Sequence, residues 1–158
     1  MERNEVGNVD KTAPKGQIRI DPDWKGCVGF IMPIFPAVIM LFVGSREEFL
    51  RHSDAVDLEF NKRLSAKERM MERDGFAHTI TEGVDALIRL PKLDMSDELC
   101  VGQLYHEALH AALNIVTAFG LEIGKGGEIL TYLQGYIVSR LLEEVRKSEE
   151  EDVSTLES

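Results

Sequence analysis

A long uncharged stretch of the chain runs from Cys27 to Gly44 and reads CVGFIMPIFPAVIMLFVG. Its length approaches that of a membrane-spanning helix, which needs about 20 consecutive apolar residues. Pro33 and Pro36 interrupt the stretch, and residues 37–43 after them form a continuous apolar run rich in β-forming residues. Such a run is typical of a strand buried on both faces. We therefore expect a sheet that other elements cover on both faces, and no membrane span.

The bulk properties narrow the class of protein. A chain of 158 residues with 44% hydrophobic residues fits one domain with its own core. The formal net charge of −10 gives no attraction to nucleic acid or to an anionic membrane, so we expect neither as a partner. Cys27 and Cys100 lie far apart without a C-x-x-C pattern, which predicts reduced thiols. No basic segment leads into an apolar one at the N-terminus, which favours a cytoplasmic protein.

We expect three regions along the chain. Residues 1–17 are polar and lack periodicity, which is typical of a flexible arm. Residues 18–147 contain the periodic apolar segments and are expected to form the single domain, beginning with a short strand near residues 17–21. Residues 148–158 are rich in Glu and Asp, which favours an acidic disordered tail.

Cap and turn signals place the elements in the middle of the chain. Ser45 and Glu48 form an S-x-x-E capping box that opens a helix. Residues 76–80 and 85–90 alternate as strands do, and Gly83 marks a turn between them, so the two segments are expected to pair as a hairpin. The second strand ends at a proline, which is common for an edge strand.

A long helix is predicted to begin at Ser96, where a cap residue is followed by two acidic residues. Gly120 is the expected end, because glycine favours the position just after a helix. The predicted buried side consists of apolar residues at helical spacing: Leu99, Leu104, Ala108, Ala111, Ala112, Ile115 and Phe119. A last helix is expected from Glu128 to about Lys147.

The long helix contains an H-E-x-x-H pattern at residues 106–110. Residues four apart lie on one face of a helix, so the imidazoles of His106 and His110 can converge on a single metal ion. Glu107 lies beside the first ligand, where its carboxylate can act as a general base for a metal-activated water. The pattern therefore predicts a zinc site with hydrolytic chemistry.

A catalytic zinc site uses three protein ligands and a water molecule. Glu128 is the preferred third ligand, because it begins a helix that a short loop would fold back against the motif helix. Glu122 is the rival, nearer to His110 in sequence but next to the turn. The remaining histidines, His52 and His78, are weaker alternatives: the first lies among charged residues and the second in a predicted strand.

Two tyrosines follow Glu128 along one face of the last helix. Tyr132 is the nearer, and its hydroxyl is a candidate donor to the oxyanion formed when water attacks a carbonyl. Tyr136 lies one turn further on, and both rings could instead pack between helices. The plainest alternative for the whole pattern is an amphipathic helix, for example in a helical adaptor, in which the motif arises by chance and no metal binds.

The stretch YHEALHAALNIVTAFGL, a short loop and the stretch EILTYLQGYI resemble the C-terminal part of small H-E-x-x-H metalloprotease-like proteins encoded by bacteriophages, over about residues 99–142. Those proteins are similar in pattern to gluzincins, whose third ligand is a Glu on a following helix. The resemblance implies a zincin-like fold, zinc as cofactor and a host-cell cytoplasm as location. It also implies that the strand Ala86–Leu90 is a sheet edge on which an extended peptide substrate is laid.

These observations together predict an α+β protein, a minimal zincin-like domain in which a small mixed sheet packs on the H-E-x-x-H helix and a Glu-bearing helix follows. The expected function is that of a zinc-dependent peptidase or hydrolase, with Glu107 as general base and Tyr132 as assistant. The alternative is a non-catalytic protein of the same fold, for example from a phage, that binds a host or virion partner.

Overall fold

The computed structural model describes residues 27–45, 47–49, 77–122, 124 and 127–156, and the statements below concern these residues. The protein is α+β, as predicted. Its elements follow the order β1 (Cys27–Ile31), β2 (Val38–Val43), β3 (His78–Glu82), β4 (Asp85–Leu90), α3 (Glu98–Ala118) and α4 (Glu128–Leu156). The expected N-terminal arm, the strand near residues 17–21 and His52 lie outside the described residues.

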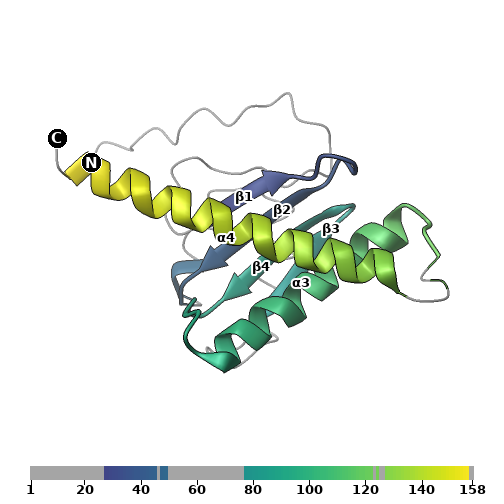
Figure 1. Ribbon diagram of the computed structural model, residues 1–158, viewed down its shortest axis with the longest axis horizontal. Helices are drawn as coiled ribbons and strands as arrows, with labels where there is room; N and C mark the ends of the chain where they lie inside the picture. The colour runs from purple at the N-terminus through teal and green to yellow at the C-terminus, as the bar shows by residue number, and fades with distance from the viewer. Residues whose placement is uncertain (1–26, 46, 50–76, 123, 125–126, 157–158) are drawn as a thin grey trace, which may run out of the picture.

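The four strands form one mixed sheet in the order β1-β2-β4-β3 (Figure 1). β1 and β2 form an antiparallel hairpin, and β3 and β4 form the second, with the turn that the sequence predicts at Gly83 (φ 58°). β2 and β4 run parallel and join the two hairpins. β1 is a strand that the sequence analysis did not identify, because only the apolar run after the prolines carried a clear strand signal.

The prediction that residues 86–90 form a sheet edge is wrong. β4 pairs with β2 on one side and with β3 on the other, and all six of its residues are buried. The proline that follows β4 ends the strand without marking an edge, because apolar residues on both faces fix β4 in the interior of the sheet. Among the described strands, β1 and β3 lie at the edges.

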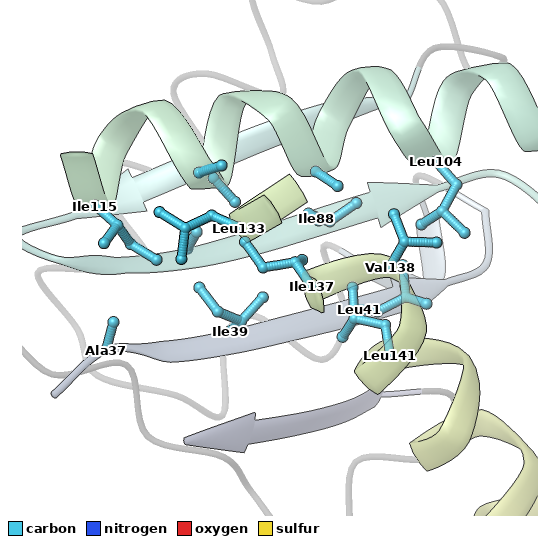
Figure 2. Packing of buried hydrophobic residues seen from close by; sticks show 14 of the residues in the cluster. Ala37, Ile39, Leu41, Ile88, Leu104, Ile115, Leu133, Ile137, Val138 and Leu141 are labelled. Atoms are coloured by element: carbon cyan, nitrogen blue, oxygen red, sulfur yellow. The ribbon is translucent and has the colours of Figure 1, made fainter. Parts of the chain in front are cut away.

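α3 and α4 cover one face of the sheet (Figure 1). Apolar side chains of β2 and β4 meet those of the two helices in the main core, which Figure 2 shows from close by. Its labelled residues are Ala37, Ile39, Leu41, Ile88, Leu104, Ile115, Leu133, Ile137, Val138 and Leu141. The helices therefore hold their positions on the sheet by burial of apolar area, which is the dominant favourable term in folding.

The opposite face of the sheet is also covered, as the unbroken apolar run predicts. Met40, Phe42, Ile80 and Leu87 form a second buried cluster there with Phe49. Phe49 follows the predicted capping box, which is confirmed: Ser45 N donates to Glu48 Oε2 at 2.8 Å and Glu48 N donates to Ser45 Oγ at 3.2 Å.

α3 begins one residue later than predicted. Asp97, not Ser96, is the N-cap, and its carboxylate accepts a hydrogen bond from Leu99 N at 3.0 Å. Gly120 follows the helix with φ 63°, as expected for a glycine that ends a helix. The prediction of burial is wrong for two residues: Leu99 is 71% exposed and Phe119 is 38% exposed, because they lie at the ends of α3. The other five are buried.

α4 is longer than predicted, since it continues past Lys147 to Leu156. The acidic segment that we expected to be disordered is thus helical over most of its length. Ion pairs between residues one turn apart stabilise α4 just before this segment: Lys147 Nζ lies 2.9 Å from Glu143 Oε1 and 3.0 Å from Glu144 Oε1. Neither of the two described long helices is apolar enough over a sufficient length to cross a bilayer.

Candidate functional site

The two motif histidines lie one turn apart on α3, and both are exposed. His106 Nε2 and His110 Nε2 are 3.1 Å apart, and the two rings are inclined at 79°. The same two ring nitrogens therefore point at a common position beside the helix. This is the convergence that the H-E-x-x-H spacing predicts.

The spacing of the two nitrogens suits two ligands of one ion. Two imidazole nitrogens bound to one zinc ion at 2.0–2.1 Å in tetrahedral geometry are about 3.3 Å apart, close to the 3.1 Å between His106 Nε2 and His110 Nε2. The same distance also suits a hydrogen bond between neutral imidazoles, in which one ring donates and the other accepts. The pair thus fits two positions of a zinc site, in which each ring would offer the lone pair of Nε2 and carry its proton on Nδ1.

Glu107 lies on the side of α3 that faces the sheet, and only 5% of its surface is exposed. Thr79 Oγ1 on β3 lies 2.7 Å from Glu107 Oε2 and 2.9 Å from the backbone carbonyl oxygen of Glu107. Burial of a carboxylate without a partner is costly, so this hydroxyl compensates for the loss of water. α3 and the edge strand β3 therefore contact each other at Glu107, the residue to which the motif assigns proton transfer.

A groove of about 350 Å³ lies beside this contact. We call it the motif groove; it is lined by Ala77, just before β3, and by residues of the first half of α3: Glu98, Leu99, Gly102, Gln103, His106 and Glu107. One predicted ligand and the predicted general base therefore face the same hollow.

The predicted third ligand begins α4. Gln134 Nε2 donates to the carbonyl oxygen of Tyr105 at 2.8 Å and so ties α4 to α3 beside the motif. Glu128 precedes Gln134 and His110 follows Tyr105, so both lie on the loop side of this contact. In the described part of the chain, no three or more His, Cys, Asp or Glu side chains are grouped as for a metal ion. The structure thus brings the two histidines together but does not group Glu128 or Glu122 with them.

His78 lies on the other side of the sheet from the motif. It is buried in β3, and its ring meets that of Phe49 edge-on at 6.5 Å between centroids. Its neighbour Thr79 contacts α3, and successive residues of a strand point to opposite faces. The alternation therefore directs His78 away from the histidine pair.

The two tyrosines line a different hollow. A groove of about 570 Å³, the apolar groove, lies between the start of α4 and the connection from β1 to β2. Its lining consists of Met32, Pro33, Ile34, Phe35, Glu128, Ile129, Tyr132, Leu133 and Tyr136. Tyr132 is 76% exposed there, and the ring of Tyr136 contacts that of Phe30 at 6.0 Å. Glu128 and Tyr132 thus share the apolar groove, whereas His106 and Glu107 share the motif groove.

The residue that sequence reasoning missed is Thr79. The pattern HTITE of β3 contains the signal, since it alternates between a face with His78 and Ile80 and a face with two threonines. Which face meets α3, and which threonine lies opposite Glu107, depends on the register between β3 and α3. The spacing of the motif residues does not determine that register.

Comparison with known proteins finds no protein-family model that matches the chain, no similar curated protein and no similar solved structure.

Proposed function

We propose that the protein is a zinc-dependent hydrolase of the zincin type that cleaves peptide bonds. The observation that carries the proposal is the 3.1 Å approach of His106 Nε2 to His110 Nε2 on an exposed helix face, next to a groove that Glu107 also lines. A general base is useful to a hydrolytic metal site and has no role in a purely structural one. Zinc, when held there, supplies Lewis-acid activation of water and of the scissile carbonyl.

Glu107 is the proposed general base. Its carboxylate takes one proton from the attacking water and gives it to the nitrogen of the leaving amine, so that proton and charge balance over the reaction. The side chain lines the motif groove and is shielded from bulk water. Shielding strengthens the electrostatic interactions of a carboxylate with the reacting atoms.

For the third protein ligand we propose Glu128, as the sequence spacing predicts. Support comes from the packing of α4 on α3 and from the hydrogen bond of Gln134 to Tyr105, which holds the start of α4 on the same side of the contact as His110. Binding of the ion would then draw the Glu128 carboxylate towards the pair from its exposed position at the rim of the apolar groove.

The proposed substrate is an extended peptide that pairs with β3. β3 takes the place of β4 as the edge strand that binds the peptide, since β4 lies inside the sheet whereas β3 has β4 as its single partner among the described strands. β3 also contacts α3 through Thr79 and Glu107, so a peptide along its outer edge would pass the motif groove. Main-chain hydrogen bonds to a strand edge are a common mode of peptide recognition.

The first test is the zinc content per chain, measured by elemental analysis on protein purified without chelators or a His-tag. We expect about one zinc in the parent protein and a loss of at least tenfold in affinity in His110→Ala and Glu128→Ala, because each change removes one of three ligands. Glu122→Ala is the matched control and should keep its zinc. A parent protein that holds no zinc after reconstitution would overturn the proposal.

The second part of the test concerns Glu107. Glu107→Gln preserves the shape of the side chain but removes the base, so zinc content should stay unchanged while peptide hydrolysis falls by about 10²- to 10⁴-fold. The measurement is cleavage of a proteome-derived peptide library by the zinc-loaded protein, followed by mass spectrometry. Equal cleavage by parent and Glu107→Gln would contradict the role of Glu107.

A second candidate function is a non-catalytic protein that binds a partner. The observation that favours it is the apolar groove, whose volume of about 570 Å³ and largely apolar, aromatic lining suit a binding site. In that case Glu107→Gln leaves the biological function intact and the zinc-loaded protein cleaves no peptide. The library experiment therefore separates the two functions.

A further inference from the structure

The Glu107 side chain has a hydrogen-bond partner with an unusual placement. Thr79 Oγ1 stands within hydrogen-bond distance of two oxygens of the same residue, Oε2 at 2.7 Å and the backbone carbonyl oxygen at 2.9 Å. A threonine hydroxyl has one proton to donate and two lone pairs to accept with. It can therefore donate to only one of these oxygens at a time.

This placement lets one hydroxyl serve Glu107 before and after proton transfer. When Glu107 is a carboxylate, the Thr79 proton points at Oε2. When Glu107 has taken a proton of water on its other carboxyl oxygen, Oε2 still accepts the same hydrogen bond from Thr79. Thr79 keeps its own proton throughout, so the contact persists in both states and nothing is gained or lost in the balance.

Thr79 is also rigidly mounted. It lies in β3 opposite Ile88 of the interior strand β4, so the sheet fixes its backbone. A β-branched side chain has few rotamers available, which fixes Oγ1 relative to that backbone. A base displaced by about 1 Å can lose a large part of its effect. A rigidly held Thr79 hydroxyl that fixes the Glu107 carboxylate would therefore raise the rate of proton transfer.

We propose that Thr79 is the positioning residue that holds the Glu107 carboxylate in place for proton transfer in the hydrolysis of a peptide. The inference rests on the proposed function, since it assigns Thr79 a part in the same reaction. The Thr79 hydroxyl faces α3 and acts through Glu107, without contact of its own to the substrate. A merely structural tie between β3 and α3 would look alike in the structure but would change stability alone.

The experiment compares three variants of the full-length, zinc-loaded protein on the peptide that the parent cleaves best in the library. Thr79→Val removes the hydroxyl and keeps the shape, Thr79→Ser keeps the hydroxyl, and Thr117→Val makes the same exchange at an exposed position near the end of α3. We expect Thr79→Val to lower kcat by about 10- to 100-fold with KM unchanged. Thr79→Ser should stay within about threefold of the parent and Thr117→Val should equal it.

Zinc content and Tm are measured on each variant, and Thr79→Ala replaces Thr79→Val if the latter does not fold. In the Glu107→Gln background, Thr79→Val should cause no further loss of kcat, because the residue acts only through the Glu107 carboxylate. A normal kcat in Thr79→Val, or an equal loss in both backgrounds, would overturn the inference. Zinc binding and the loss in Glu107→Gln would still uphold the proposed function in that case. A zinc-loaded parent that cleaves no library peptide would overturn both.

Discussion

Burial gives Glu107 a different character from the histidines on either side of it. His106 and His110 are exposed to solvent, whereas Glu107 turns towards the sheet. The small residues Ala108 and Ala111, both fully buried, let α3 approach the sheet closely enough for Thr79 to reach the carboxylate. Within about one turn of α3, the two histidines of the motif thus face the solvent and its glutamate faces the core.

The two cysteines give a prediction about reactivity. Burial raises the pKa of the Cys27 thiol to about 12 from its ordinary value of 9.0. Only the thiolate reacts with a disulfide reagent, and at pH 8 the thiolate fraction falls by about a thousandfold when the pKa rises by three units. We expect native Cys27 to react with Ellman's reagent at least a hundred times more slowly than the unfolded protein does.

The measurement uses Cys100→Ala, which leaves Cys27 as the single thiol. Because the raised pKa belongs to the folded state, the unfolded chain loses the thiol proton first as the pH rises above 9, and stability should fall there. Complete labelling of the native variant within the time needed for the unfolded one would contradict the raised pKa of this thiol.

At the scale of the elements, the start of α3 gives a prediction about pH. A hydrogen bond from Lys92 at 2.7 Å, together with the one from Leu99 N, holds the pKa of the Asp97 carboxyl below its ordinary value. Its contribution to stability is therefore present above the ordinary pKa of about 3.9 and lost as the pH falls through the lower folded-state value. Asp97→Ala should lower Tm by about 2–4 °C at pH 7.

Thermal unfolding followed by circular dichroism between pH 7 and pH 3 checks this. The difference in Tm between the parent and Asp97→Ala should narrow at the acidic end. Asp97→Asn keeps a cap acceptor without the charge, so it should lose mainly the pH-dependent part. Ser96→Ala is the control for the position of the cap, and a larger loss there than in Asp97→Ala would return the N-cap to Ser96.

The elements that sequence reasoning predicted correctly are those whose signal is local. β2 and the hairpin of β3 and β4 follow from short apolar patterns and a turn glycine, and α3 follows from its cap and period. β1 was missed because the residues of Cys27–Ile31 show no alternation between apolar and polar. The position of β4 was wrong because its neighbours in the sheet are set by a parallel pairing with a distant strand, which leaves no mark in the sequence around residues 85–90.

The site divides in the same way. The spacing of His106 and His110 is a property of one helix, so the sequence alone predicts their convergence. The placement of Glu128 and Tyr132 depends on the rotation of α4 about its axis, which the core residues of that helix decide, and it turns both towards the apolar groove. Thr79 depends on the docking of α3 on β3. The spacing of residues along the sequence therefore does not predict these contacts between elements.

At the scale of the whole molecule, the sheet consists of two hairpins that meet in the parallel pair of β2 and β4. Asp85 fastens this junction: its side chain is fully buried, and Oδ1 accepts a hydrogen bond from Val38 N at 2.7 Å. Asp85→Ala leaves the Val38 N–H without this acceptor inside the protein. We expect a loss of about 2–3 kcal/mol in the free energy of unfolding.

Chemical denaturation in urea, followed by circular dichroism, measures this loss. Asp85→Asn keeps an acceptor oxygen in place and should cost clearly less than Asp85→Ala. Asp152→Ala, at an exposed position near the end of α4, is the control for removing one negative charge. If Asp85→Ala unfolds at the same urea concentration as the parent, the junction does not depend on this contact.

The order of the elements along the chain also has a consequence for synthesis on the ribosome. β2, the most apolar of the described strands, is translated early, yet its second partner β4 and its covering helices α3 and α4 come only later in the chain. At about 5–20 residues per second, the nascent chain keeps this strand without its native cover for several seconds. An apolar β-forming segment without its partners is prone to aggregate. The strand that anchors the finished core is therefore the part of the growing chain with most need of a chaperone.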